Sequence, residues 1–265
     1  MAAARRRVSE SKRSADMKAL ERAAEAHLVR GFRRKLQAVS GTRPAIIAEL
    51  KKASPSKGLI RDPLHVGALA AELARNGAAA LSVLTEEERF LGSLANLCEA
   101  SAATELPCLR KDFIVDEFQL LEARANRADA VLLIVAGLEQ RELVFLNSRA
   151  RALGLDVLCE VHDSGELKRA VDAGFEIIGV NTRDLRTFSV DPRRAFELAP
   201  MFPTSVVRVA ESGITNGEDV AALRAAGYEA FLIGESLMRA EFPGVALKEL
   251  LQEATAATSK QVAPS

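Results

Sequence analysis

Residues 45–60 read AIIAELKKASPSKGLI, an apolar run that becomes charged within a few residues and then breaks into a loop. The apolar part is typical of a buried parallel strand. Because strand side chains alternate between faces, Ile47, Glu49 and Lys51 share one face. The Ser-Pro-Ser-Lys-Gly sequence at 54–58 is typical of a loop. A strand that ends in opposite charges beside a polar loop predicts the rim of a site, with a Glu–Lys pair on a solvated surface as the alternative.

Short apolar runs of this kind alternate with amphipathic segments along the rest of the chain. The expected strands are 45–51, 79–84, 106–111, 130–135, 156–161, 177–181, 206–211 and 230–234. The expected helices are 64–75, 94–101, 116–126, 139–152, 165–173, 192–198, 217–226 and one from 245 onward. Eight alternations of strand and helix predict an α/β fold, a single (β/α)8 TIM barrel, rather than an open sheet. No Gly-x-Gly-x-x-Gly follows the first strand, which argues against a dinucleotide-binding fold.

The expected domain organisation is one barrel with two appendages. Residues 1–43 are expected to form an N-terminal helical extension packed on the barrel, residues 44–255 the catalytic barrel, and residues 256–265 a flexible C-terminal tail. In the extension, a helical stripe is expected at Met17, Leu20, Ala24, His27 and Leu28, with Gly31 separating it from a second helix. The Arg- and Ser-rich start resembles a transit peptide, but acidic residues interrupt it and a helix is the preferred interpretation.

Composition limits the classes of partner. Lys plus Arg equals Asp plus Glu at 36 each, so no global field attracts nucleic acid or a membrane surface. No apolar run approaches the roughly 18 residues that a membrane span needs. The three cysteines, Cys98, Cys108 and Cys159, lack metal-ligand spacing, and their odd number fits a reducing compartment. We therefore expect a cytoplasmic monomer whose cysteines are small core residues and which has no metal site.

The ends of the predicted strands carry the candidate site. In a TIM barrel the active site lies at the C-terminal ends of the strands. Five predicted strands end in polar residues that stand above apolar residues of the same face: Glu49 with Lys51, Lys111, Glu160, Asn181 and Glu211. Surface charges would be scattered over both faces, so this agreement predicts one shared site. The neighbours Arg110, Asp112 and His162 have the other parity or lie past the strand, and are interpreted as structural or supporting residues.

Two glycine-containing turns predict where a phosphate would bind. Ser212-Gly213 and Gly234-Glu235 each follow a strand end and precede a helix, which exposes backbone N–H groups to an anion. They follow the seventh and eighth strands, where many barrels bind phosphate. The pair favours a phosphorylated ligand.

At this point seven segments of the chain match a known family. IIAELKKASPSKG, SVLTEEERFLGS, LRKDFIVDEFQL, CEVHD, IGVNTRDL, VAESGI and FLIGESLM occur in this order. Together they closely resemble indole-3-glycerol phosphate synthase of tryptophan biosynthesis, from about Gly31 to Leu250. The chain departs from the family in having Thr182 where Asn or Ser is frequent and Glu235 where some members have Ser, and its N-terminal helix looks shorter than in many relatives.

The resemblance implies a role for each matching residue. Lys111 would be the general acid and Glu160 the base or proton partner. The residues implied to orient the substrate, share in proton transfer or complete the site are Glu49, Lys51, Asn181, Glu211 and Ser212. Those implied for the phosphate and loop region are Ser54, Gly213, Gly234 and Glu235, with Arg183 near the anionic groups. Those implied to flank an aromatic ring are Phe90, Phe113, Leu133 and Leu185.

The implied reaction converts 1-(o-carboxyphenylamino)-1-deoxyribulose 5-phosphate, a small phosphorylated substrate, into indole-3-glycerol phosphate. Ring closure needs a proton donor at the ketone oxygen, which a protonated Lys111 supplies. The cationic ring formed by closure accepts the electrons of decarboxylation, so no cofactor is expected. Which lysine acts in which step stays open. The alternatives are another phosphosugar barrel enzyme, such as phosphoribosylanthranilate isomerase, and a catalytically silent barrel that binds a phosphorylated metabolite.

Overall fold

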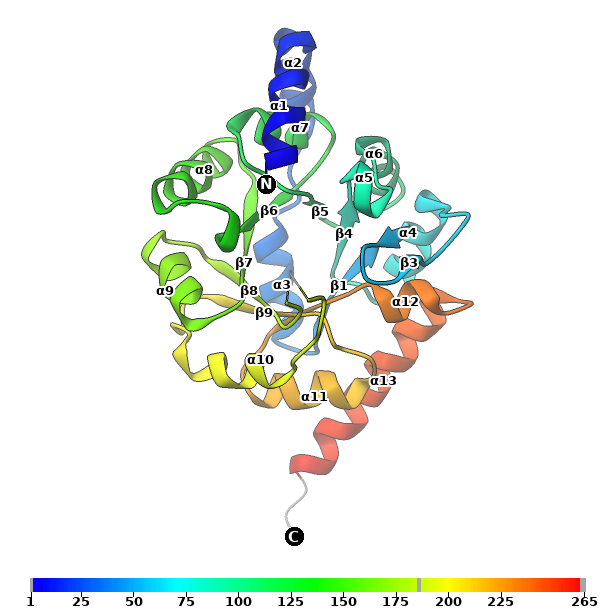
Figure 1. Cartoon of the computed structure of the whole chain (residues 1–265). Helices are drawn as coiled ribbons and strands as arrows, with labels where there is room; N and C mark the ends of the chain where they lie inside the picture. Colours follow the sequence, from blue (N-terminus) through cyan, green and yellow to red (C-terminus); the bar gives the residue numbers. More distant parts are fainter. Residues whose placement is uncertain (1, 185–186, 263–265) are drawn as a thin grey trace.

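The computed structural model describes residues 2–184 and 187–262, and within them parallel strands close into a barrel (Figure 1). The hydrogen-bonded order is β1-β10-β9-β8-β7-β6-β5-β4. The strands are β1 (Ala45–Leu50), β4 (Ala80–Leu84), β5 (Cys108–Lys111), β6 (Ala130–Ile134), β7 (Asp156–Val161), β8 (Ile177–Asn181), β9 (Val207–Glu211) and β10 (Ala230–Ile233). The predicted TIM barrel is confirmed. The third strand starts later than predicted, at Cys108.

Helices surround the barrel, one after each strand. They are α4 (Val66–Arg75), α6 (Leu94–Ala102), α7 (Glu117–Ala125), α8 (Gln140–Ala152), α9 (Ser164–Asp172), α10 (Arg193–Leu198), α11 (Gly217–Ala225) and α13 (Pro243–Val262). Shorter pieces at the mouth and between the helices are β2 (Ala53–Ser54), β3 (Gly58–Leu59), α5 (Glu87–Phe90), η1 (Val135–Gly137), η2 (Ala199–Met201) and α12 (Glu235–Arg239). Among the described residues no helix has the length and apolar character needed to span a membrane.

The last helix continues past residue 255, where a flexible tail was expected, because α13 extends to Val262. The segment expected to be a tail contains Ala, Lys and Gln, which favour a helix. Ala254 is buried against α11, where a Cβ at Gly217 would lie 2.4 Å from the Ala254 nitrogen. This packing holds α13 against the barrel up to the predicted end. Residues 263–265 of the expected tail lie outside the described residues.

The N-terminal extension consists of α1 (Ala2–Ser14), α2 (Met17–Ala26) and α3 (Phe32–Ser40). In Figure 1, α1 and α2 stand beside α7 at the barrel periphery, whereas α3 lies across the centre of the barrel. The expected stripe is wrong at Leu28, whose side chain is 84% exposed, because α2 already ends at Ala26. Gly31 separates α2 from α3 as predicted, with a left-handed backbone at φ 69°.

Two hydrophobic clusters follow from the alternation of strand side chains. One cluster fills the barrel, and its lower end is closed by Phe32 and Leu36 of α3, both fully buried. The other lies between the strands and the surrounding helices and includes Cys108 and Cys159. These two thiols are core residues as predicted, and Cys98 is half-buried. Residues that continue the inner face upward are therefore the ones that reach the mouth of the barrel.

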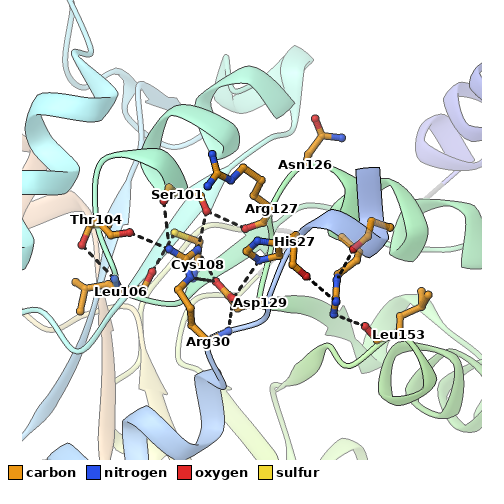
Figure 2. Close-up of polar contacts among 12 residues, drawn as sticks. His27, Arg30, Ser101, Thr104, Leu106, Cys108, Asn126, Arg127, Asp129 and Leu153 are labelled. Carbon is orange, nitrogen blue, oxygen red and sulfur yellow. Dashed lines mark hydrogen bonds and ion pairs between the residues drawn. The ribbon is translucent and has the colours of Figure 1, made fainter. Parts of the chain in front are cut away.

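A buried carboxylate anchors the extension to the lower end of the barrel (Figure 2). Asp129, fully buried just before β6, accepts hydrogen bonds from the Arg30 backbone nitrogen at 2.7 Å and the Arg30 guanidinium at 2.7 Å and 3.0 Å. It also accepts from the Cys108 backbone nitrogen at 2.7 Å and contacts His27 Nε2 at 3.2 Å. The Arg30 guanidinium continues to the Ser101 and Thr104 carbonyl oxygens. The segment between α2 and α3 is thus tied to two barrel strands.

Candidate active site

The polar residues predicted from the strand ends lie in one pocket at the mouth of the barrel. They continue the inner face of the strands, above Ile47, Leu109, Leu158 and Val209 of the barrel interior. The pocket wall includes Glu49, Lys51, Lys111, Glu160, Asn181, Glu211 and Ser212. The side chains proposed to bind substrate that reach the same wall are Ser54, Phe90, Phe113, Arg183 and Glu235. The structure therefore brings these residues together, while their individual roles remain predictions.

Lys111 lies at the centre of the charged part of the pocket. Its Nζ atom is 3.0 Å from Glu211 Oε2 and 3.1 Å from Glu160 Oε2. Burial by itself would lower the pKa of the Lys111 ammonium, but the neighbouring carboxylates of Glu211, Glu160 and Glu49 outweigh it and raise the pKa. The lysine is therefore held in its charged form, which the sequence alone left undecided.

The two carboxylates that flank Lys111 differ in their environment. Burial raises the pKa of Glu211 to about 7, against the opposing effect of Lys111 and with a further rise from Glu160. For Glu160, burial is outweighed by Lys111 and His162, which lower the pKa. Glu211 Oε1 is buried and finds no hydrogen-bond partner among the described residues. A pair of carboxyl groups whose pKa values are pushed apart suits proton transfer in both directions.

Glu49 and Lys51 form a largely buried ion pair in the same pocket, so the surface-pair alternative is wrong. Lys51 Nζ lies 2.7 Å from Glu49 Oε1, and the two side chains are 14% and 6% exposed. Burial would raise the pKa of Glu49, but Lys51 and Lys111 lower it. Ser82 Oγ donates to Glu49 Oε2 at 3.4 Å. Sequence reasoning missed Ser82, although its position two residues after Ala80 places it on the inner face.

Glycines make room for these carboxylates. A Cβ atom at Gly234 would lie 2.7 Å from Glu49 Oε1, and one at Gly179 would collide with Glu211 Oε1. Gly234 was predicted as a phosphate-binding residue from its place after β10. The structure adds a second reason for glycine there, because any side chain would displace Glu49.

Ser212 has a strained backbone at the mouth of the barrel. Its φ angle is 65°, which is uncommon for a non-glycine residue, and Gly213 follows at φ 73°. Ser212 Oγ donates to Asn181 Oδ1 at 2.8 Å, and the Arg183 backbone nitrogen donates to the same oxygen at 3.0 Å. These two contacts on Oδ1 fix the orientation of the Asn181 side-chain amide. Backbone strain of this kind is frequent at functional sites.

One residue predicted on the apolar side of the pocket lies elsewhere. Phe90 and Phe113 line it as predicted, together with Leu132 and Ile134 of β6. Leu133 was predicted there but is wrong, because it packs between the barrel and the helices on the outer face of β6. Leu185, also predicted, lies outside the described residues. Further apolar lining comes from residues not singled out from sequence, namely Pro55, Leu84, Phe188 and Leu232.

A second hollow adjoins the pocket at the ends of β9 and β10. It is lined by Gly213, Gly234 and Glu235, the three residues predicted to bind phosphate, and by Lys57, Arg183 and Arg239. The Glu235 carboxylate lies 3.4 Å from a guanidinium nitrogen of Arg183, 3.4 Å from one of Arg239 and 3.7 Å from Lys57 Nζ. Ser54 belongs to the wall of the central pocket rather than to this hollow. The hollow combines the backbone of two glycine-containing turns with three cations.

The residues interpreted from sequence as structural or supporting lie around the pocket. Arg110 is buried and pairs with Asp112 at 3.0 Å and Glu122 at 2.8 Å, which is a structural role. His162 directs its ring towards Glu160, which fits the predicted supporting role. No group of three or more His, Cys, Asp or Glu residues suited to a metal occurs in the part of the chain that the structure describes.

With the site defined, comparison with known proteins identifies the family. A family model described as indole-3-glycerol phosphate synthase matches residues 1–250. The chain belongs to the indole-3-glycerol phosphate synthase family. The indole-3-glycerol phosphate synthase of Koribacter versatilis (strain Ellin345) is 56% identical over 93% of this chain and 95% of that protein. That of Burkholderia vietnamiensis (strain G4 / LMG 22486) is 45% identical over 94% of this chain and 96% of that protein.

Membership of the indole-3-glycerol phosphate synthase family confirms the predicted class, a carboxy-lyase of tryptophan biosynthesis. Solved structures with low sequence identity show the shared barrel. A 3-hexulose-6-phosphate synthase crystal structure superposes with a TM-score of 0.63 at 14% identity, over 79% of this chain and 99% of that chain. A crystal structure of mandelate oxidase with (S)-2-phenylpropionate gives 0.62 at 20% identity, over 83% of this chain and 75% of that chain. These likenesses support the fold alone.

Proposed function

We propose that the chain converts 1-(o-carboxyphenylamino)-1-deoxyribulose 5-phosphate into indole-3-glycerol phosphate by ring closure, decarboxylation and dehydration. The observation that carries the proposal is the position of Lys111 between Glu160 and Glu211, on the floor of a pocket with an apolar side and a cationic side. The substrate has the same division, since its aromatic ring and its phosphate lie at opposite ends of the sugar chain. An isomerase would not need a second buried lysine such as Lys51.

Ring closure is the step assigned to Lys111. The ring carbon that bears the carboxylate attacks the ketone carbon, and the ketone oxygen takes a proton as its double bond opens. The Lys111 ammonium is charged at neutral pH, and its neighbours Glu160 and Glu211 fix its Nζ atom. Because these contacts already hold the ammonium in position, little conformational entropy is lost when it transfers the proton.

Decarboxylation and dehydration follow on the same pocket floor. The C–C bond to the carboxylate breaks, and its electron pair returns to the cationic ring formed by closure. The apolar wall around Phe90, Phe113 and Leu132 favours this step, because charge is lost from the substrate. Dehydration then needs an acid at the departing hydroxyl and a base for the ring proton. Glu160, which accepts a hydrogen bond from Lys111, and the Glu49–Lys51 pair are the groups within the pocket for these transfers.

The anionic groups of the substrate fit the cationic hollow. The phosphate is assigned to the backbone of Gly213 and of the Gly234-Glu235 turn, with Lys57 and Arg183 beside it. In this proposal the chain acts as a monomer in the cytoplasm, on a small phosphorylated substrate and without a cofactor. Nucleic acid and membranes are not partners, in keeping with the balanced charge of 36 basic and 36 acidic residues.

The experiment follows indole fluorescence, because the chain contains no Trp. Purified protein and the carboxyphenylamino-deoxyribulose phosphate are mixed, and growth of indole emission is expected. Lys111→Ala is expected to lower kcat by about 10²- to 10⁴-fold with a much smaller change in KM. Lys168→Ala, at an exposed lysine on α9, is the control and should leave both unchanged. Absence of indole from folded wild-type protein would overturn the proposal and favour the isomerase or the silent binding barrel.

A further inference from the structure

His162 follows β7 and connects Glu160 in the pocket with Glu166 on α9. Its Nδ1 atom lies 3.0 Å from Glu166 Oε2, and its backbone nitrogen donates to the same oxygen at 2.8 Å. Its Nε2 atom lies 3.4 Å from Glu160 Oε1 and is buried, without a hydrogen-bond partner in residues 2–184 and 187–262. The side chain of His162 is 12% exposed and that of Glu166 is 17% exposed.

The contacts restrict where protons can reside. A carboxylate accepts hydrogen bonds and cannot donate them, so Nδ1 of His162 carries the proton that it shares with Glu166. In a neutral imidazole the other nitrogen, Nε2, is then an acceptor. It would face Glu160 Oε1, which is also an acceptor, at 3.4 Å. The arrangement is favourable only when one proton lies between Nε2 and Oε1.

We propose that His162 and Glu160 share this proton, and that His162 is a positioning residue that reloads Glu160 as the acid of the dehydration step. This inference rests on the proposed function. In the transfer, the Nε2–H bond of an imidazolium breaks and an Oε1–H bond forms on Glu160. The Glu160 acid then protonates the departing hydroxyl, which leaves as water. The proton lost from the ring carbon when the pyrrole forms restores the pair, so protons balance over one turnover.

The surrounding charges support a loaded histidine. The charges of Glu166 from α9, Glu160 from β7 and Glu211 from β9 act on His162. Lys111 from β5 contacts the other oxygen of Glu160. Burial lowers the pKa of His162, but the hydrogen bond to Glu166 and the charges of Glu160, Glu166 and Glu211 raise it above its ordinary value. Glu160 thus lies between two cationic groups, with Oε2 on Lys111 and Oε1 on His162.

A purely structural role for His162 would rest on the same Glu166 contact. Glu166 lies in the first turn of α9, where the Asp163 side chain accepts from its backbone nitrogen at 2.8 Å. Loss of the His162 ring could therefore loosen the start of α9 and affect activity only through stability. The pH dependence of kcat separates the two roles, because a structural role predicts an unchanged pH profile.

The first measurement is an NMR pH titration of the imidazoles in wild-type protein, which has three histidines, and in Glu166→Gln. We expect the His162 ring to titrate above the ordinary value of about 6.5 and to move downward in Glu166→Gln. Substitution of His27 and of His65 assigns the signals. A pKa of the His162 ring below the ordinary value of about 6.5 would overturn the shared proton. This result does not depend on the substrate, so failure of the proposed function is distinguished from failure of this inference.

The second measurement is the pH dependence of kcat for His162→Gln and Glu166→Gln. In wild type, kcat is expected to decline as the pH rises through the raised pKa of His162, because the imidazolium is lost. In His162→Gln that decline should be absent. Its kcat should be lower than that of wild type by roughly tenfold or more, a smaller loss than is expected for a group that itself protonates the substrate. Its KM should stay within about twofold of the wild-type value. His65→Gln, at an exposed histidine before α4, is the matched control.

An active His162→Gln enzyme with the wild-type kcat and pH profile would overturn the inference while leaving the proposed function intact. Parallel loss of thermal stability and activity with an unchanged pH profile would assign His162 a structural role only. If His162→Gln does not fold, Glu166→Gln provides the same comparison, because it keeps an oxygen that can accept from Nδ1 but removes the negative charge that stabilises the imidazolium.

Discussion

The Glu211 carboxylate on β9 leans across the Cα atom of Gly179 on the neighbouring strand β8. Gly179 pairs with Val209, which lies two residues before Glu211, so Gly179 and Glu211 lie on the inner face of the barrel. A Cβ atom at position 179 would collide with Glu211 Oε1, and Leu158 Cδ1 would lie 3.2 Å from it. The missing side chain of Gly179 is therefore what allows Glu211 to reach Lys111.

Gly179→Ala is expected to separate Glu211 from Lys111. Overpacking of this kind costs about 1–3 kcal/mol of unfolding free energy, and kcat should fall more than tenfold while the barrel is retained. Denaturant unfolding and steady-state kinetics check the two effects. Gly41→Ala is the control, since its Cβ would have its nearest neighbour at 3.9 Å. Unchanged kcat in Gly179→Ala would mean that Glu211 does not need its present position.

The stability of the protein is expected to depend on the protonation of Glu211. Its pKa in the folded state is raised to about 7 by burial, so the folded state holds a proton that the unfolded state has lost. The Glu211 contribution to stability is therefore present at acidic pH and is lost as the pH rises towards and through about 7. Glu211→Gln should lack this loss, so its unfolding free energy relative to wild type should increase from pH 5 to pH 8. A constant difference between the two would contradict the raised pKa.

Asp129 is expected to be the principal anchor of the N-terminal extension. Asp129→Ala leaves the Arg30 guanidinium and the Cys108 backbone nitrogen without their buried acceptor. Breaking a buried ion pair from one side costs about 3–5 kcal/mol, and thermal unfolding would measure it. Limited proteolysis should then cut between α2 and α3 faster than in wild type. Asp129→Asn keeps the shape of the side chain and removes its charge, so its cleavage rate should lie between those of wild type and Asp129→Ala. Equal protection of all three proteins from proteolysis would contradict the role of Asp129 as an anchor.

The Asp129 contribution should also weaken in acid. Hydrogen bonds from His27 and Arg30 outweigh burial and lower the pKa of Asp129. A carboxyl group with a lowered pKa contributes stability above its unfolded value and loses that contribution as the pH falls through the folded pKa. The stability difference between wild type and Asp129→Asn should accordingly shrink on acidification.

Glu235 is expected to compete with the phosphate of the substrate. Its carboxylate contacts Lys57, Arg183 and Arg239 in the hollow assigned to phosphate. Because these pairs are partly exposed, each contributes on the order of 1 kcal/mol or less, and Glu235→Gln should lower KM and the inhibition constant of inorganic phosphate a few-fold. Glu218→Gln, at an exposed residue of α11, serves as the control. A higher KM would show instead that Glu235 is needed to hold the cations in place.

The sequence predicted those parts of the site that follow from strand parity. Glu49, Lys111, Glu160 and Glu211 each stand two residues above an apolar residue on a short strand, and parallel strands bring their C-terminal ends to one edge. Leu133 was implied by the family resemblance and not by this rule. Because β6 is apolar on both faces, its sequence does not reveal which face turns inward. Closure of the barrel decides that Leu132 lines the pocket.

The local sequence by itself therefore determined the eight strands, their order along the chain and the chemistry at their ends, because period-2 alternation and turn residues act over a few positions. Only the tertiary structure decided which charges meet. The Lys111–Glu211 pair joins residues 100 positions apart, and the Arg30–Asp129 anchor joins residues 99 apart. His162 shows the same limit, since its ring is aimed at Glu160 by Glu166 from the next helix. Contact distances and burial set the pKa values of these groups, and both arise only when the barrel closes.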